Sequence, residues 1–165
     1  MSANYVNLNV DDNDAGAGKF PLGTLGSNDG GKTIFERIKF NDGDGGDAAV
    51  AGHLIVGLDS GYPDGEVTND PNSATITAHD QDPRGFLQRV ITDLYYGWAQ
   101  CWGRNKQVVI TSGTINAGAT VMAHPTTTGA VIAHDASAVP EVGVALEAAS
   151  GDELQIGELK IKIRC

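Results

Sequence analysis

The chain is poor in basic, aromatic and sulfur-containing residues. It has 165 residues, with 11 Lys and Arg against 21 Asp and Glu, so its formal net charge is −10, and only 6% of the residues are aromatic. Phosphate backbones repel such a chain, so the sequence predicts no binding to nucleic acid. The two cysteines, Cys101 and Cys165, make neither a CxxC motif nor a disulfide framework. Their pairing stays open, and we expect Cys101 to be a small buried side chain.

Long apolar runs are missing as well. No apolar stretch approaches the length needed to span a membrane. The first residues, Met1–Asn4, have neither the positive charge nor the apolar stretch of a signal peptide. The sequence therefore predicts a soluble, non-secreted protein that does not bind membranes.

Glycine is abundant, with 22 residues that fall between short apolar segments. Alternation with a period of two is clearest in Tyr96–Gly103, where Trp98, Gln100 and Trp102 share one face, and in Leu159–Arg164, where apolar and basic residues alternate. This pattern predicts half-buried strands. Many short strands separated by Gly and Asx turns are typical of a barrel or a sandwich, and the chain is long enough for one core.

The sequence also contains an approximate internal repeat. Ala51–Gly103 and Ala117–Ile156 both read as Ala-Gly, a short apolar strand, a loop, a Gly-apolar strand, a turn, and a strand with an interior Gln. We therefore predict an all-β fold, a small β-barrel or β-sandwich that is either jelly-roll-like or built as two half-barrels. Residues 34–165 would form this domain. Residues 1–33 carry little apolar periodicity and would form an extended N-terminal arm, either without fixed structure or ordered on a partner.

Three segments have weaker patterns. Thr33–Phe40 fits a strand or one helical turn. Phe86–Leu94 has some helical spacing, but the repeat favours a strand. Ala74–Ala78 is predicted to be an edge strand.

One segment, Gly26–Thr33, matches the spacing of a phosphate-binding P-loop. A P-loop needs a buried strand before it and a helix after it, so that backbone amides converge on the phosphate. Phe20–Leu25 is a poor central strand, and the segment that follows is short. Asp29 would also place a negative charge in the phosphate site. The sequence therefore does not predict nucleotide binding.

The acidic turn at 41–47 holds the candidate metal ligands. Asp42, Asp44 and Asp47 alternate with glycines and offer the oxygen ligands that Ca²⁺ prefers, but the Glu that closes an EF-hand is missing. Asp and Gly are also the ordinary residues of turns. We therefore predict no metal and no other cofactor.

Catalytic patterns are not found. The four histidines have no zinc-ligand spacing. A nucleophile elbow is absent, and nothing selects a pair of carboxylates for glycoside chemistry. The sequence predicts no catalytic residue and no enzymatic activity. The histidines are His53, His79, His124 and His134.

Two segments, Tyr95–Gly103 (YYGWAQCWG) and Val142–Ala149 (VGVALEAA), resemble the capsid decoration (cement) proteins of tailed bacteriophages. In that group a Tyr-Gly-Trp strand segment follows a first barrel half. A Gly-Val-Ala-Leu-Glu-Ala-Ala segment, a Gly-led turn and a charged final strand close the second half. The resemblance covers roughly residues 48–164, whereas residues 1–33 and 41–47 match nothing in the group.

The resemblance implies a structural virion protein. Such a protein is made in the host cytoplasm and binds the outer capsid surface, where it clamps adjacent major capsid subunits against internal DNA pressure. Its partners would be the major capsid protein and further copies of itself, in a homotrimer. The candidate interface residues lie in the arm, at one tryptophan and in the last strand: Tyr5, Val6, Leu8, Val10, Phe20, Leu22, Trp102, Leu159, Ile161 and Ile163.

Two other functions stay open. The first is a β-sandwich carbohydrate-binding module that uses exposed Trp side chains and a calcium ion in the Asp-rich turn. We expect Trp98 to lie in the core and leave Trp102 open between core and surface. The second is a hydrolase with a carboxylate site that the sequence does not reveal.

Overall fold

The computed structural model describes residues 8, 13–16, 20–42, 49–57, 66–70, 83–110, 113–135, 140–151 and 155–163. At 150, 151, 155–160 and 162 the description covers the backbone alone. All regular structure in this part of the chain is β, which confirms the predicted all-β class. The strands are β1 (Leu25–Gly26), β2 (Ile34–Phe40), β3 (Leu54–Gly57), β4 (Glu66–Thr68), β5 (Pro83–Leu87), β6 (Tyr96–Ile110), β7 (Gly113–Ile115), β8 (Thr120–Ala123), β9 (Val131–Ala133), β10 (Glu141–Ala145), β11 (Ala149–Gly151) and β12 (Gln155–Lys162).

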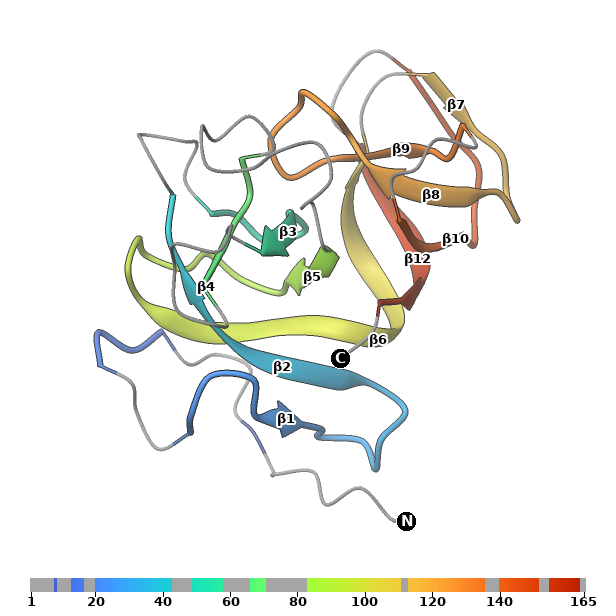
Figure 1. Cartoon of the computed structure of the whole chain (residues 1–165). Coiled ribbons are helices and arrows are strands. Elements are labelled where there is room, and N and C mark those ends of the chain that lie inside the picture. Colours follow the sequence, from blue (N-terminus) through green and yellow to red (C-terminus); the bar gives the residue numbers. More distant parts are fainter. Residues whose placement is uncertain are drawn as a thin grey trace.

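One sheet of ten strands closes on itself twice (Figure 1). In the first closed ring, here called the first barrel, β6 pairs with both β5 and β2, and β4 and β3 complete the circuit. In the second barrel, β6 pairs with β12 and, at Ile110, with β9, and β10 and β8 complete the circuit. The 15-residue strand β6 curves from one barrel into the other and belongs to both.

The two barrels have the same topology. The order around the first is β2-β4-β3-β5-β6, and the order around the second is β6-β9-β8-β10-β12. Each barrel contains one parallel pair, β2 with β4 and β6 with β9, and its other pairs are antiparallel. The last strand of the first barrel therefore serves as the first strand of the second.

The repeated Ala-Gly dipeptides occupy equivalent places in the two barrels. Gly52 precedes β3 and Gly118 precedes β8, with φ angles of +90° and +85° that favour glycine. The Gly52 N–H donates to the Leu87 carbonyl at the end of β5, and the Gly118 N–H donates to the Ala145 carbonyl at the end of β10, both at 2.8 Å. The internal repeat in the sequence thus corresponds to a repeated backbone arrangement.

Each barrel has its own cluster of buried apolar side chains. The first barrel encloses Ile38, Phe40, Ala49, Ile55, Val67, Leu87, Ile91 and Ala99. The second barrel encloses residues of β6, β8, β9, β10 and the end of the chain. Leu54 of β3 and Phe86 of β5 belong to this second cluster, so the cores meet at the junction of the barrels.

Two of the three segments with weaker patterns lie among the described residues. Thr33–Phe40 contains β2 and no helical turn. In Phe86–Leu94 the strand ends at Leu87, and the following residues run irregularly to Leu94, which has a φ angle of +62°. Ala74–Ala78 lies outside the described residues.

Candidate interaction surface along β6

The outer face of β6 changes character along its length. Ala99 and Cys101 point into the barrel cores. Trp98, Gln100 and Trp102 alternate with them and share one face, as the period-two pattern predicted, and this face lies on the outside of the barrels. The exposed fraction of Trp98 is 1% and that of Trp102 is 42%. Two tryptophans on one strand face therefore have opposite environments, and the reason lies in the N-terminal segment.

This segment, here called the strap, comprises residues 8, 13–16 and 20–26 among those described. Leu8 belongs to a buried cluster with Phe35 and Trp98. The ring of Phe20 meets the ring of Trp98 edge to face, with the centroids 5.7 Å apart. Burying aromatic area in this geometry stabilises the contact beyond the hydrophobic term alone. The strap thus covers the Trp98 half of the β6 face.

An ion pair holds the strap at the same place. Arg37 of β2 is only 1% exposed, and its Nη2 donates to the Oδ2 atom of Asp14 at 2.9 Å. Its guanidinium carbon also lies 5.4 Å from the ring centroid of Trp98 and 5.8 Å from that of Tyr96, within cation–π range. Asp14 and Tyr96 exchange two backbone hydrogen bonds of 3.0 and 2.9 Å. The buried cation is therefore compensated by a carboxylate and two aromatic faces.

The predicted interface residues of the arm divide into two groups. Leu8, Phe20 and Leu22 lie in the strap, where Leu8 and Phe20 contact the body of the same chain. Tyr5, Val6 and Val10 lie outside the described residues. The division of the chain at residue 33 stays a prediction.

Two of the three residues on the predicted apolar face of the last strand point into a core. Ile161 has no exposed area and Ile163 is 5% exposed, and both belong to the cluster inside the second barrel. Closure of the barrel explains this result, because the apolar face of β12 becomes interior. We therefore remove both residues from the interface candidates. Leu159 is described by its backbone only. Trp102 remains an exposed candidate.

The acidic turn is described only in part. Asp44 and Asp47 lie outside the described residues. The Asp42 N–H donates to Oδ1 of Asp93 at 2.9 Å, and burial followed by the Asp93 charge raises the pKa of Asp42. Among the described residues, no three acidic, His or Cys side chains are grouped as metal ligands would be.

The segment with P-loop spacing joins two antiparallel strands, β1 and β2. Its backbone amides serve the loop itself: the Gly31 N–H donates to Ser27 Oγ and the Thr33 N–H donates to Asp29 Oδ1, both at 2.8 Å. The hydrogen bonds from Thr33 lower the pKa of Asp29. A strand follows in place of a helix, so this loop lacks the geometry that binds phosphate.

A polar seam joins the barrels near β3 and β9. The Gly129 N–H donates to the Asn69 carbonyl at 2.7 Å, and the Leu54 N–H donates to the Gly129 carbonyl at 2.8 Å. Buried His53 and Asn69 are hydrogen bonded through Nδ1 and Nδ2 at 2.9 Å. A Cβ atom at Gly129 would collide with the ring of His53. Glycine is therefore required where the second barrel contacts the first.

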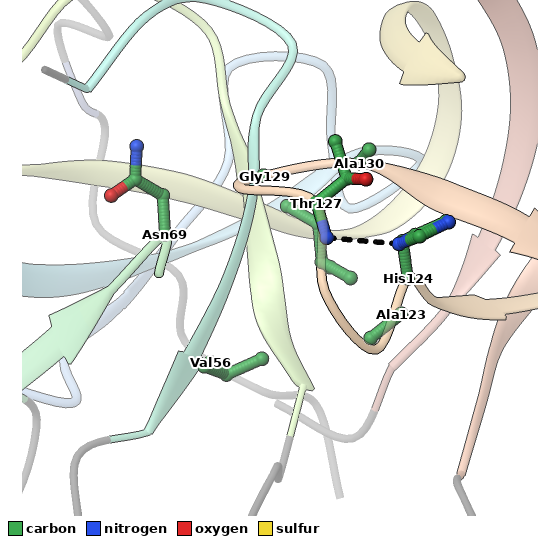
Figure 2. A pocket seen from close by; sticks show the side chains of 8 residues that line it. Val56, Asn69, Ala123, His124, Thr127, Gly129 and Ala130 are labelled. Carbon is green, nitrogen blue, oxygen red and sulfur yellow. Dashed lines mark hydrogen bonds between the residues drawn. The ribbon is translucent and has the colours of Figure 1, made fainter. Parts of the chain in front are cut away.

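A small hollow lies along this seam (Figure 2). Its volume is about 10 Å³, and it is lined by Leu54, Val56, Asn69, Ala123, His124, Thr127, Gly129 and Ala130. A cavity needs about 10–15 Å³ of such space to hold a single water molecule. Nδ1 of His124 accepts the N–H groups of Thr126 and Thr127 at 3.2 and 2.9 Å, and burial lowers its pKa. The side chain fixes a turn, and the hollow is too small for most ligands.

Cys101 is disulfide-bonded. The sequence contains one other cysteine, Cys165, which lies outside the described residues. The sequence left this pairing open and favoured a plain buried side chain. Local sequence patterns do not predict the pairing of cysteines that lie far apart in the chain, because the closure of a barrel determines which residues meet.

The contacts of the strap are not apparent from the sequence. Asp14 and Arg37 are 23 positions apart, and no local pattern links them. The available signal was Arg37 itself, a cation in an otherwise largely apolar segment that fits a strand. Such a residue needs a partner when it is buried.

Comparisons with known proteins assign no family. No protein-family model matches the chain, and no curated protein matches it in sequence. Within the described ranges, the structure has no helix that is long and apolar enough to cross a membrane.

Proposed function

We propose that the chain is a capsid decoration protein of a tailed bacteriophage. In this proposal it binds the outer surface of the capsid and stabilises the head by clamping adjacent major capsid subunits. The resemblance of Tyr95–Gly103 and Val142–Ala149 to decoration proteins suggests this function. The structural observation that supports it is the pair of closed barrels with identical topology, fused through β6.

This architecture suits a clamp for two physical reasons. Closed rings leave few free strand edges, so the body resists uncontrolled edge-to-edge association. Two barrels on one continuous strand form a unit that can transmit force between neighbouring subunits. Exposed Trp102, on the shared strand, supplies the kind of aromatic anchor that interfaces favour. Repetition over a capsid lattice would add many weak contacts through avidity.

The test is binding to empty heads of the phage that encodes the chain, after removal of their own decoration protein. We expect the purified chain to cosediment with these heads and to raise their temperature of disruption. Trp102→Ala should weaken binding. Val90→Ala, which truncates another exposed apolar side chain (55% exposed), is the matched control and should bind normally. Failure of the wild-type chain to cosediment would refute the proposal.

Self-association as a homotrimer is part of the same proposal. Sedimentation velocity over a range of concentrations measures it directly. A single species with the mass of three chains supports a trimer, and a monomer at all concentrations contradicts it.

A second candidate function has one observation in its favour. The exposed ring of Trp102 could stack on a sugar, as in carbohydrate-binding modules. Titration with a panel of oligosaccharides tests this alternative. A lectin-like function requires saturable binding that Trp102→Ala abolishes, and a chelator would reveal any dependence on calcium in the Asp-rich turn.

A further inference from the structure

Positive charge is concentrated at one place in this acidic chain. Five of the 11 Lys and Arg residues fall within 104–106 and 160–164, and neither segment contains Asp or Glu. These segments belong to β6 and to the end of the chain at β12, which are neighbours in the second barrel. In a protein with a net charge of −10, this distribution gives one strand pair a sign opposite to the whole.

The structure places the described side chains of this group on the surface. Trp102, Arg104 and Lys106 are exposed and alternate with buried Gly103 and Asn105. They therefore form a continuous outer stripe, which we call the basic face. The backbone register sets Lys160 opposite Arg104 and Lys162 opposite Trp102.

The first barrel shows what such a face can bind. Its equivalent strand pair, β2 with β6, carries a cation, Arg37, beside an aromatic ring, Trp98. The strap covers this pair with the carboxylate of Asp14 and the ring of Phe20. In the second barrel the strand pair at the same topological position is β6 with β12. It again offers an aromatic ring beside cations, yet Trp102 remains 42% exposed.

We propose that the basic face binds an extended acidic segment of a partner protein, in which a carboxylate lies near an apolar or aromatic side chain. Charge complementarity and the example of the strap support this occupant. Nucleic acid fits less well, because the rest of the molecule repels phosphate. The strap of a second copy also fits less well, because that segment is engaged on its own first barrel. The inference does not rest on the proposed capsid function.

The probe is a fluorescent peptide with the sequence of residues 8–20, LNVDDNDAGAGKF, which carries the chemistry of the strap. A second peptide has Asn at its three Asp positions. Fluorescence anisotropy is measured with the whole protein at low and moderate salt. We expect saturable binding of the acidic peptide that weakens with salt, and at least about tenfold weaker binding of the Asn peptide.

Two variants locate the binding. R104E/K106E should reduce affinity for the acidic peptide by at least about tenfold, because it replaces attraction with repulsion. R104K/K106R keeps the positive charge at both positions and should bind normally, and circular dichroism checks that both variants fold. Binding that is unchanged in R104E/K106E, or no binding to the wild type, overturns the proposal. Tighter binding of a short DNA duplex with the same Arg104 and Lys106 dependence overturns it in favour of nucleic acid. Dimerisation of the wild type that R104E/K106E abolishes overturns it in favour of a second copy.

Discussion

The first and second barrels share strand order and strand polarity but are stabilised by different devices. The strap covers the first barrel and holds it through Asp14, Phe20 and the rings around Arg37. In the second barrel, Cys101 is disulfide-bonded, and the described side chains of the basic face on β6 are exposed. The comparison teaches that one strand order, with matching backbone hydrogen bonds at Gly52 and Gly118, can be repeated while the outer surfaces diverge.

The disulfide should have a large effect on stability, and on the second barrel in particular. Cross-linking Cys101 to the only other cysteine, Cys165, closes a loop of roughly 65 residues, for which chain entropy predicts about 4 kcal/mol. We expect reductant to lower the free energy of unfolding by about 2–4 kcal/mol in urea titrations. Hydrogen exchange should accelerate in β8 and β10 more than in β3 and β5.

Cys165→Ser is the control for this prediction. It leaves Cys101 in the core and should be as unstable as the reduced wild type, with no further response to reductant. If the urea midpoint of the wild type does not change under reduction, the disulfide contributes nothing to stability.

The two tryptophans of β6 provide the next test, because both lie on the same face of the strand and only Trp98 is covered by the strap. Trp98→Ala removes a ring that is 1% exposed and contacts Phe20 and Arg37. We expect a loss of about 3 kcal/mol or more, as for other buried aromatic truncations. Trp102→Ala, at 42% exposure, should cost less than about 1 kcal/mol. Equal losses of stability for the two variants in thermal or urea unfolding would contradict the division of the β6 face into a covered half and an exposed half.

The sequence predicted the parts of this fold that depend on local patterns. Alternation located the first half of β6, Tyr96–Gly103, and its two faces, and the Ala-Gly repeat predicted a twofold construction. The closures could not be predicted, because they depend on β6 pairing with four other strands and on register shifts between them. The candidate surface was predicted at Trp102 alone. The extent of this surface is set by the contacts of Leu8 and Phe20 with Trp98, which no local pattern encodes.

A smaller effect is expected from pH at His124, in the second barrel. Its Nδ1 must be unprotonated to accept the Thr126 and Thr127 N–H groups, and burial lowers its pKa below the usual 6.5. The folded state then binds fewer protons than the unfolded state. The contribution of His124 to the free energy of unfolding is fully present above about pH 6.5 and is lost as the pH drops through the lowered pKa. We expect a loss of about 1 kcal/mol by pH 5 in urea titrations.

His124→Asn separates titration from hydrogen bonding. Its amide oxygen can accept a backbone N–H in the turn but does not titrate. The variant should therefore lose the stability change between pH 7 and 5 while keeping the turn. If the variant still loses stability between pH 7 and 5 as the wild type does, His124 is not the source of that loss.

Asp42 should give the smallest effect, with the opposite sign and on the first barrel, whose residues Phe40 and Asn41 precede it. Burial and the Asp93 charge raise its pKa, so the folded state binds more protons than the unfolded state. The favourable contribution is complete below the unfolded pKa of about 3.9 and is lost as the pH rises through the raised pKa. Asp42→Asn, which keeps the N–H donated to Asp93, should raise the melting temperature by about 1–2 °C at pH 7 and leave it unchanged near pH 3. Acid therefore destabilises the second barrel through His124 and removes an unfavourable contribution to the stability of the first barrel at Asp42. A stabilisation that persists at pH 3 would show that the variant acts through contacts other than charge.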